Sequence, residues 1–151
     1  MPERKTLARA ARDRRQRKAA TTQAGEFVRE EMHHVREGKH GARSAKQAIA
    51  IGLSKARRAG VDLKPPKKGT TSEKTRRSAA NAYAAGHEDT KKPVSVRRSR
   101  AVESALEREG HSAASKTALS RQAKSAARKR SAADRSAAAR KAAKTRARRA
   151  H

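Results

Sequence analysis

Large apolar side chains are rare in this chain, and they gather in two neighbouring stretches within residues 25–63. In the first stretch they recur at i, i+4 and i+7 starting from Val28, which is the spacing of one helical face. In the second, AKQAIAIGLSKARRAG (45–60), small and apolar residues share a helical stripe, and Ile51 falls outside it. We predict two helices packed as an antiparallel hairpin. The residues expected at its core or at a partner contact are Phe27, Val28, Met32, Val35, Ile49, Ile51 and Leu53.

Residues that favour helix ends flank both stretches. Thr22 is a candidate N-cap for the first helix and Gly38 a candidate stop. Ser44 is a candidate N-cap for the second helix, and Gly60 stands where a C-terminal glycine cap is expected, with Val61 able to fold back onto the last turn. These residues at the helix ends therefore support a short loop between two helices.

The remaining regions are polar, basic or rich in alanine, and the proposed fold class is all-α. A small helical hairpin is expected with additional short helices and a long Ala/Lys/Arg-rich C-terminal helix, largely extended or disordered when free. Proline-containing linkers are expected at KPPKK (64–68) and TKKP (90–93). The predicted regions are a basic N-terminal arm (1–24), the hairpin (25–63), a linker with a short Ala-rich helix at 72–86 (64–98), a short helix (99–110) and a basic Ala-rich tail (111–151).

Composition limits how much of the chain can form a core. The 151 residues carry a formal net charge of +27. Leu, Ile, Val and Phe together number 14, well below the roughly 20% under which highly charged chains are typically disordered. A hairpin of about 40 residues is also near the size at which small folds need a metal, a disulfide or a partner, and the chain has no Cys. Ile51, outside the stripe, is a candidate contact with a second copy or another protein.

The charge points to nucleic acid as the main partner. Residues 111–151 hold thirteen Lys and Arg against a single acid, Asp134. Repulsion within such a segment is relieved by the phosphates of a polyanion. No zinc-finger spacing, basic zipper or aromatic RNA-binding motif is present, so we expect DNA binding without base readout. The candidate nucleic-acid-binding residues are Arg12, Arg14, Arg15, Arg17, Lys18, Lys124, Arg128, Lys129, Arg130, Arg135, Arg140, Lys141, Lys144, Arg146, Arg148 and Arg149.

Two alternatives stay open at this point. Phosphate electrostatics do not separate DNA from RNA, so an RNA-bound or ribosome-associated basic protein fits the same composition. An adaptor fits as well, in which the hairpin binds a protein partner while the basic arms tether it to any polyanion.

Other function classes lack support in the sequence. No nucleophile elbow or phosphate-cradling glycine loop appears, so an enzyme is not expected, and neither is a cofactor. His33 and His34 lie among Glu30, Glu37 and His40, but they also fit a solvated helix face, so we predict no metal site. No apolar run is long enough to cross a membrane.

The segment FVREEMHHVREGKHGARSAKQAIAIGLSKARRAG (27–60) resembles a family of small basic bacterial proteins of unassigned function. These share an acidic segment with a Met, a Gly-Lys loop and a QAIAIALSEA-like helix. Gly52 stands here at a place that is commonly Ala, and Lys55 at one that is commonly acidic. The C-terminal Lys/Arg/Ala region is similar to those of linker histones and bacterial histone-like proteins. Together the resemblances imply a histone-like, nucleoid-associated protein of the bacterial cytoplasm.

Overall fold

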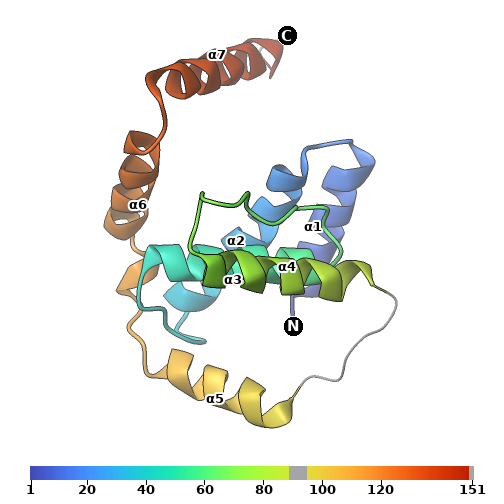
Figure 1. Cartoon of the computed structure of the whole chain (residues 1–151), viewed down its shortest axis with the longest axis vertical. Helices are drawn as coiled ribbons and strands as arrows, with labels where there is room; N and C mark the ends of the chain where they lie inside the picture. Colours follow the sequence, from blue (N-terminus) through green and yellow to red (C-terminus); the bar gives the residue numbers. More distant parts are fainter. Residues whose placement is uncertain (89–94, 150–151) are drawn as a thin grey trace. The chain divides into compact units, whose positions relative to one another are not determined.

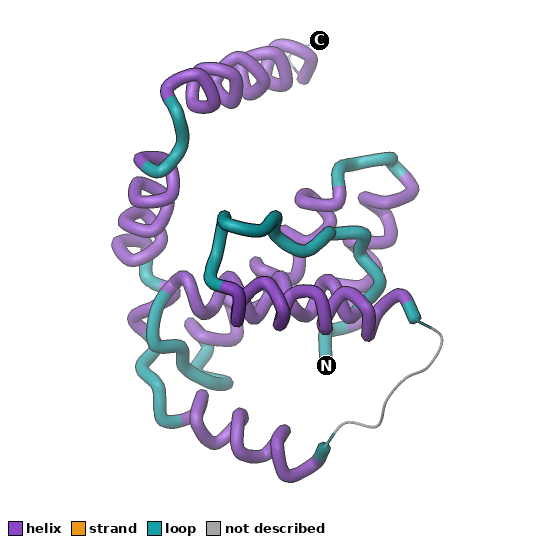
Figure 2. Tube along the Cα trace, viewed as in Figure 1, coloured by secondary structure: helices purple, strands orange, loops and turns teal. Residues whose placement is uncertain are grey.

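The fold is described from a computed structural model, which defines residues 1–88 and 95–149 (Figure 1). All regular structure in these residues is helical, as predicted, and they contain no strand (Figure 2). The chain forms two compact units, an N-terminal unit (Met1–Ser115) and a C-terminal unit (Lys116–His151). The expected linker TKKP (90–93) lies outside the described residues. The elements are α1 (Arg4–Arg15), α2 (Ala20–Arg36), α3 (Ala45–Arg58), α4 (Glu73–His87), α5 (Val96–Glu107), the 3-10 helix η1 (Ser112–Ala114), α6 (Lys116–Arg128) and α7 (Ala132–Arg149).

The predicted hairpin corresponds to α2 and α3, and most of its end signals are confirmed. The Ser44 side chain accepts a hydrogen bond from the Gln47 backbone N–H. Gly60 has a φ of +82°, and the Val61 N–H returns to the Ala56 carbonyl at 3.1 Å, as in a glycine cap. The predicted N-cap at Thr22 is wrong, because α2 begins two residues earlier, at Ala20, after an N-cap residue without a capping side chain.

The seam between α2 and α3 is made of small residues. On α3 the buried residues are Ala45, Ala48, Gly52, Ala56 and Arg57. A Cβ atom added at Gly52 would lie 2.7 Å from the Cα of Val28, so the two helix backbones approach each other closely there. Of the apolar residues expected in this hairpin, Phe27, Met32 and Val35 are buried, whereas Val28, Ile49, Ile51 and Leu53 are half-buried.

The N-terminal segment differs from the extended arm that its charge suggests. Residues 4–15 form α1, which packs on α2, and its Ala10 side chain is buried. The reason is that alanine spaced along a helix can fill a tight interface without a large apolar side chain. The cluster that joins α1, α2, α3 and the segment after α3 consists of Ala10, Ala24, Phe27, Ala56 and Val61, with Ala20, Leu53 and Leu63 packed against it.

Helices α3 and α4 also pack together, so α3 contacts a helix on each of two sides. Ser72 caps α4 by accepting from the Thr75 N–H, at the place predicted for the short Ala-rich helix. Near the other end of α4, a Cβ at Gly86 would overlap the carbonyl oxygen of Arg57, at 2.0 Å. Glycine therefore permits α4 to cross the end of α3 at this point.

The chain after α5 returns to the loop between α2 and α3. The Gly41 N–H donates to the Leu106 carbonyl at 2.9 Å, and the Ala42 N–H donates to the Gly110 carbonyl at 3.0 Å. η1 then packs on α2, where Arg36 Nε donates to the Ala114 carbonyl at 2.9 Å. Residues up to 115 thus belong to the N-terminal unit, whereas the sequence placed the start of the basic tail at residue 111.

The C-terminal unit contains α6 and α7 rather than one long helix. The helix expected there is interrupted at Lys129–Ser131. Ser131 caps the start of α7. Its hydroxyl oxygen accepts from the Asp134 N–H at 3.1 Å, and its hydroxyl group donates to the Asp134 carboxylate at 2.7 Å. This reciprocal arrangement resembles a capping box, so the sole acid of the C-terminal unit is used as a helix start signal. Disorder of the free protein in solution stays a prediction.

Candidate nucleic-acid interface

Most of the candidate cations lie on α6, on α7 and in the break between them. Lys124 and Arg128 belong to α6, Lys129 and Arg130 to the break, and the others to α7. From residue 120 to residue 148 every position is exposed except Gln122, which is half-buried. The cationic groups between residues 121 and 148 are therefore accessible to a macromolecular ligand.

On α6 three of the four cations share one side of the helix. Arg121, Lys124, Ser125 and Arg128 follow each other at i, i+3, i+4 and i+7, and together with Lys129 they line one shallow surface pocket. Leu119 lies on another side of the helix and is half-buried. Arg121 was not among the predicted residues, although the i, i+3, i+7 spacing in the sequence would have found it.

On α7 the cations fall on two opposite sides of the helix axis. Lys141 lies beside Lys144 and Arg148 on the side that also carries Arg140, whereas Arg135, Arg146 and Arg149 lie on the opposite side. Between them stand alanines, which favour the helix and leave its surface narrow. A helix with this distribution presents positive charge on two opposite sides.

The positive charge of the C-terminal unit has no internal counter-charge. Asp134 is its single acid, and its carboxylate accepts from Ser131. None of the described cations there forms an ion pair; Arg135, for example, donates to the carbonyl of Arg130 at 3.0 Å. The electrostatic field is therefore directed outward, toward any polyanion.

The N-terminal candidates lie around the end of α1, and one of them is already paired. Arg12, Arg14 and Arg15 are exposed in its last turn, where cations complement the helix dipole. Arg17, also exposed, follows the helix with a φ of +53°. Lys18 Nζ lies 2.7 Å from the buried carboxylate of Asp13, so it holds the end of α1 and its charge is largely neutralised within the fold.

A second basic pocket, not predicted from the sequence, opens in the N-terminal unit. It has a volume of about 600 Å³ and is lined by Arg58, Glu73, Lys74, Arg77, Ser78, Asn81 and Arg98. A hydrogen bond from Arg76, with Arg77 nearby, lowers the pKa of Glu73, which keeps this one acid charged and internally compensated. Sequence reasoning missed the pocket because its cations come from α3, α4 and α5, far apart along the chain.

Comparison with known proteins gives a partial match. Residues 15–68 are similar to a family described as a family of unknown function (DUF6496). That range begins at the end of α1, includes α2 and α3, and ends before α4. It overlaps the segment on which the sequence resemblance was based. No curated protein and no solved structure matches the chain. None of the described helices combines the length and the hydropathy that a membrane crossing requires.

Proposed function

We propose that this protein binds duplex DNA without reading its base sequence, as a histone-like, nucleoid-associated protein of the bacterial cytoplasm. The C-terminal unit supplies the affinity. The observation that carries the proposal is the exposed, internally uncompensated charge of the C-terminal unit, with thirteen Lys and Arg against one acid. The phosphate backbone is the natural counter-charge because each contact releases condensed counterions.

The placement of the cations supports backbone contacts over base readout. Specific readers place a few side chains on one helix face, toward base edges in the major groove. The cations of α7 lie on two opposite sides of the helix, so only some of them can face one groove at a time. Asn is absent from the C-terminal unit and Gln occurs once, at position 122, so it has few of the amides that pair with adenine. Phosphates, which surround the duplex, can meet cations at many angles.

The proposal is tested by removing charge from α7 without changing its helix propensity. In the charge-removed variant, the seven cations Arg135, Arg140, Lys141, Lys144, Arg146, Arg148 and Arg149 are replaced by Gln, which favours helices about as well. In the matched control the five arginines among them become Lys, so the charge stays and the guanidinium geometry is lost. Binding to a fluorescent duplex is followed by anisotropy at about 0.1 M salt.

We expect the Gln variant to bind duplex DNA about a hundredfold more weakly or worse, because roughly half of the seven cations contact phosphate at any time. The Lys control should stay within a few-fold of the wild type, since a point charge serves a phosphate nearly as well. An equal loss in both variants would show that guanidinium geometry is being read and would contradict the proposal. Binding at least tenfold tighter to an RNA duplex of the same sequence would assign the protein to RNA instead.

A further inference from the structure

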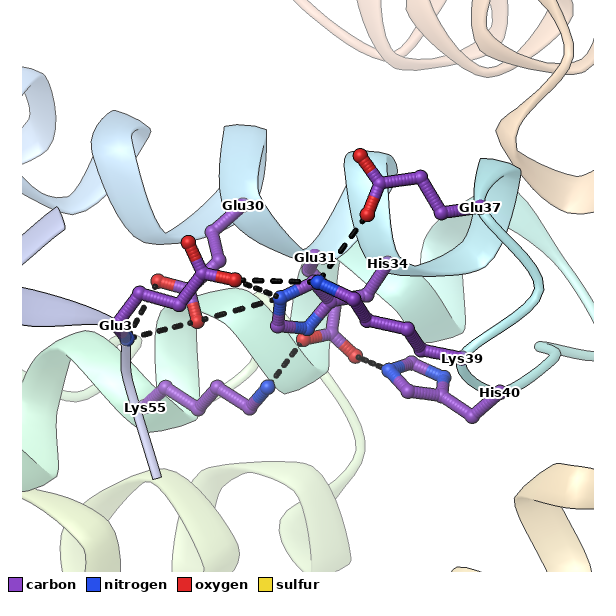
Figure 3. A network of polar contacts seen from close by, with 8 residues as sticks. All are labelled: Glu3, Glu30, Glu31, His34, Glu37, Lys39, His40 and Lys55. Atoms are coloured by element: carbon purple, nitrogen blue, oxygen red, sulfur yellow. Dashed lines mark hydrogen bonds and ion pairs between the residues drawn. The ribbon is translucent and has the colours of Figure 1, made fainter. Parts of the chain in front are cut away.

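The most unusual polar site of the N-terminal unit is centred on Glu31 of α2 (Figure 3). Its side chain is 0% exposed. One carboxylate oxygen, Oε2, accepts from Lys55 Nζ at 2.6 Å. The other, Oε1, has no hydrogen-bond partner and lies 3.2 Å from Nε2 of His40. A buried polar atom without a hydrogen bond is costly, so this oxygen requires an explanation.

The orientation of His40 decides what its ring can offer to this unpartnered oxygen of Glu31. Its Nδ1 lies 3.1 Å from the Gly41 carbonyl oxygen, which can only accept, so Nδ1 carries a hydrogen. In the neutral ring the lone pair of Nε2 then points at Glu31 Oε1. Two electron-rich atoms 3.2 Å apart are complementary to a cation, which is either a proton on Nε2 or a metal ion that both atoms bind.

His34 brings a third ligand to the same place. It follows Glu31 by three residues on α2, so both side chains leave the same face of the helix. The ring of His34 lies edge-on to that of His40, with centroids 6.0 Å apart. Glu31, His34 and His40 each offer one ligand atom, and these atoms lie within 4.8 Å of one another. Ligands at about 2.0–2.2 Å in tetrahedral geometry are spaced by about 3.3–3.6 Å, so small side-chain movements would close the site.

We propose that Glu31, His34 and His40 bind one divalent transition-metal ion, with Zn²⁺ the best-matched, and that water completes its coordination. Two imidazoles and one carboxylate favour Zn²⁺ over Mg²⁺ or Ca²⁺, which prefer oxygen ligands alone. Lys55 on Oε2 of Glu31 and the Gly41 carbonyl on Nδ1 of His40 are the outer partners that orient metal ligands. This site is independent of the proposed DNA binding, and the sequence alone predicted no metal here.

The surrounding charges are compatible with a bound cation. Glu3 Oε1 lies 2.9 Å from Nε2 of His34 and also accepts from Lys39, and these two contacts lower the pKa of Glu3. Glu30, buried beside it, accepts from the Glu3 backbone N–H at 3.2 Å. The local excess of carboxylates offsets Lys39 and Lys55. A metal here would tie the loop that carries His40 to α2.

The test uses the full, tag-free protein stripped of metal and titrated with Co²⁺, a spectroscopic substitute for Zn²⁺. We expect the intense visible absorption of four- or five-coordinate Co²⁺ to saturate at one equivalent and to disappear when one equivalent of Zn²⁺ is added. His40→Asn and Glu31→Gln should each weaken Co²⁺ binding at least about tenfold. The matched control is His33→Asn, on the same turn of α2 but exposed, and it should bind Co²⁺ like the wild type.

Glu31→Gln also removes the partner of Lys55, so folding is checked for each variant by far-UV circular dichroism. The wild type supplies a readout that needs no variant: one equivalent of Zn²⁺ should raise its Tm, because a ligand that binds the folded state stabilises it. The weak spectrum of octahedral aqueous Co²⁺ in the wild type, or a Tm unaffected by Zn²⁺, would overturn the proposal. So would a His33→Asn variant that loses as much Co²⁺ affinity as His40→Asn.

Discussion

The two units of this chain differ in whether their charged side chains pair with one another. In the N-terminal unit six of the twelve described acids pair with Lys or Arg, as in Lys18–Asp13, Arg9–Glu26 and Lys55–Glu31. In the C-terminal unit a single acid accepts from a serine and the described cations have no carboxylate partner. The first arrangement holds helices together, whereas the second leaves the charge available to a partner.

The difference teaches that net charge alone does not mark the binding surface. Residues 1–115 hold twenty-eight Lys and Arg, more than twice the thirteen of the C-terminal unit. Several of them are committed to the fold: Arg57 is buried, donates to the Leu63 carbonyl at 2.9 Å, and has its pKa lowered by burial. In the proposed function, the cations that bind DNA are those of the C-terminal unit, whose described members have no carboxylate partner.

The largest effect is expected from ending the chain after Ser115. Removal of α6 and α7 deletes about six phosphate contacts and should weaken duplex binding about a thousandfold at 0.1 M salt. The N-terminal unit should keep its helices and its thermal unfolding, because η1 and everything before it remain. Anisotropy and circular dichroism measure the two properties. A truncated protein that still binds DNA tightly would place the interface at α1 or at the basic pocket near Arg58.

The converse experiment damages the N-terminal unit alone. Gly52→Val places atoms against the Val28 backbone and should lower the free energy of unfolding by at least about 1–3 kcal/mol, because the helices must separate. The matched control is Gly25→Ala on α2, where an added Cβ meets nothing within 4 Å, and a gain of up to about 1 kcal/mol is expected. Urea unfolding gives both values.

DNA affinity of Gly52→Val, measured where the variant is still folded, should stay within about twofold of the wild type. A loss as large as that caused by truncation would mean that the two units do not act separately.

A smaller effect concerns the helicity of the C-terminal unit. No side chain described in α7 is buried, so its helix lacks the packing that normally stabilises helices in proteins. We expect the far-UV helical signal of the free protein to rise as duplex DNA is added, because phosphates screen the repulsion among the cations. The protein ending at Ser115 serves as the control. A helical signal that stays flat would show that α6 and α7 need no polyanion to form.

The smallest effect is a pH dependence within the N-terminal unit. Tyr83 donates from its hydroxyl to Asp62 Oδ1 at 2.6 Å, and this hydrogen bond raises the pKa of Tyr83. Its folded pKa lies above the unfolded value of about 10, so its stabilising contribution is complete below about pH 10 and is lost as the pH rises through the folded pKa. Tyr83→Phe should flatten the decline of stability in that alkaline range.

Tyr83 is the single tyrosine of the chain, so tyrosinate absorbance reports its titration directly. A pKa identical in the native protein and in denaturant would show that the bond to Asp62 does not persist in solution.

The sequence predicted the features that depend on local residue patterns. The α2–α3 hairpin followed from apolar spacing, and the caps at Ser44 and Gly60 followed from residue type. Packing of α1 could not be predicted, because an alanine such as Ala10 has the same local signature in a buried helix as in an exposed one. The contact between Glu31 and His40 could not be predicted from the sequence either, because the conformation of the loop after α2 decides which histidine contacts which acid.

The central claim is that the C-terminal unit binds phosphates and does not read bases, and salt dependence tests it most directly. If about half of its thirteen cations contact phosphate, log K should fall with log salt with a slope near −5, at about −0.9 per contact. Affinity is measured for two unrelated duplexes at several salt concentrations. The account predicts the same steep slope and similar affinity for both. A slope shallower than about −2, or a preference above about 100-fold (~2.7 kcal/mol) for one sequence, would contradict it.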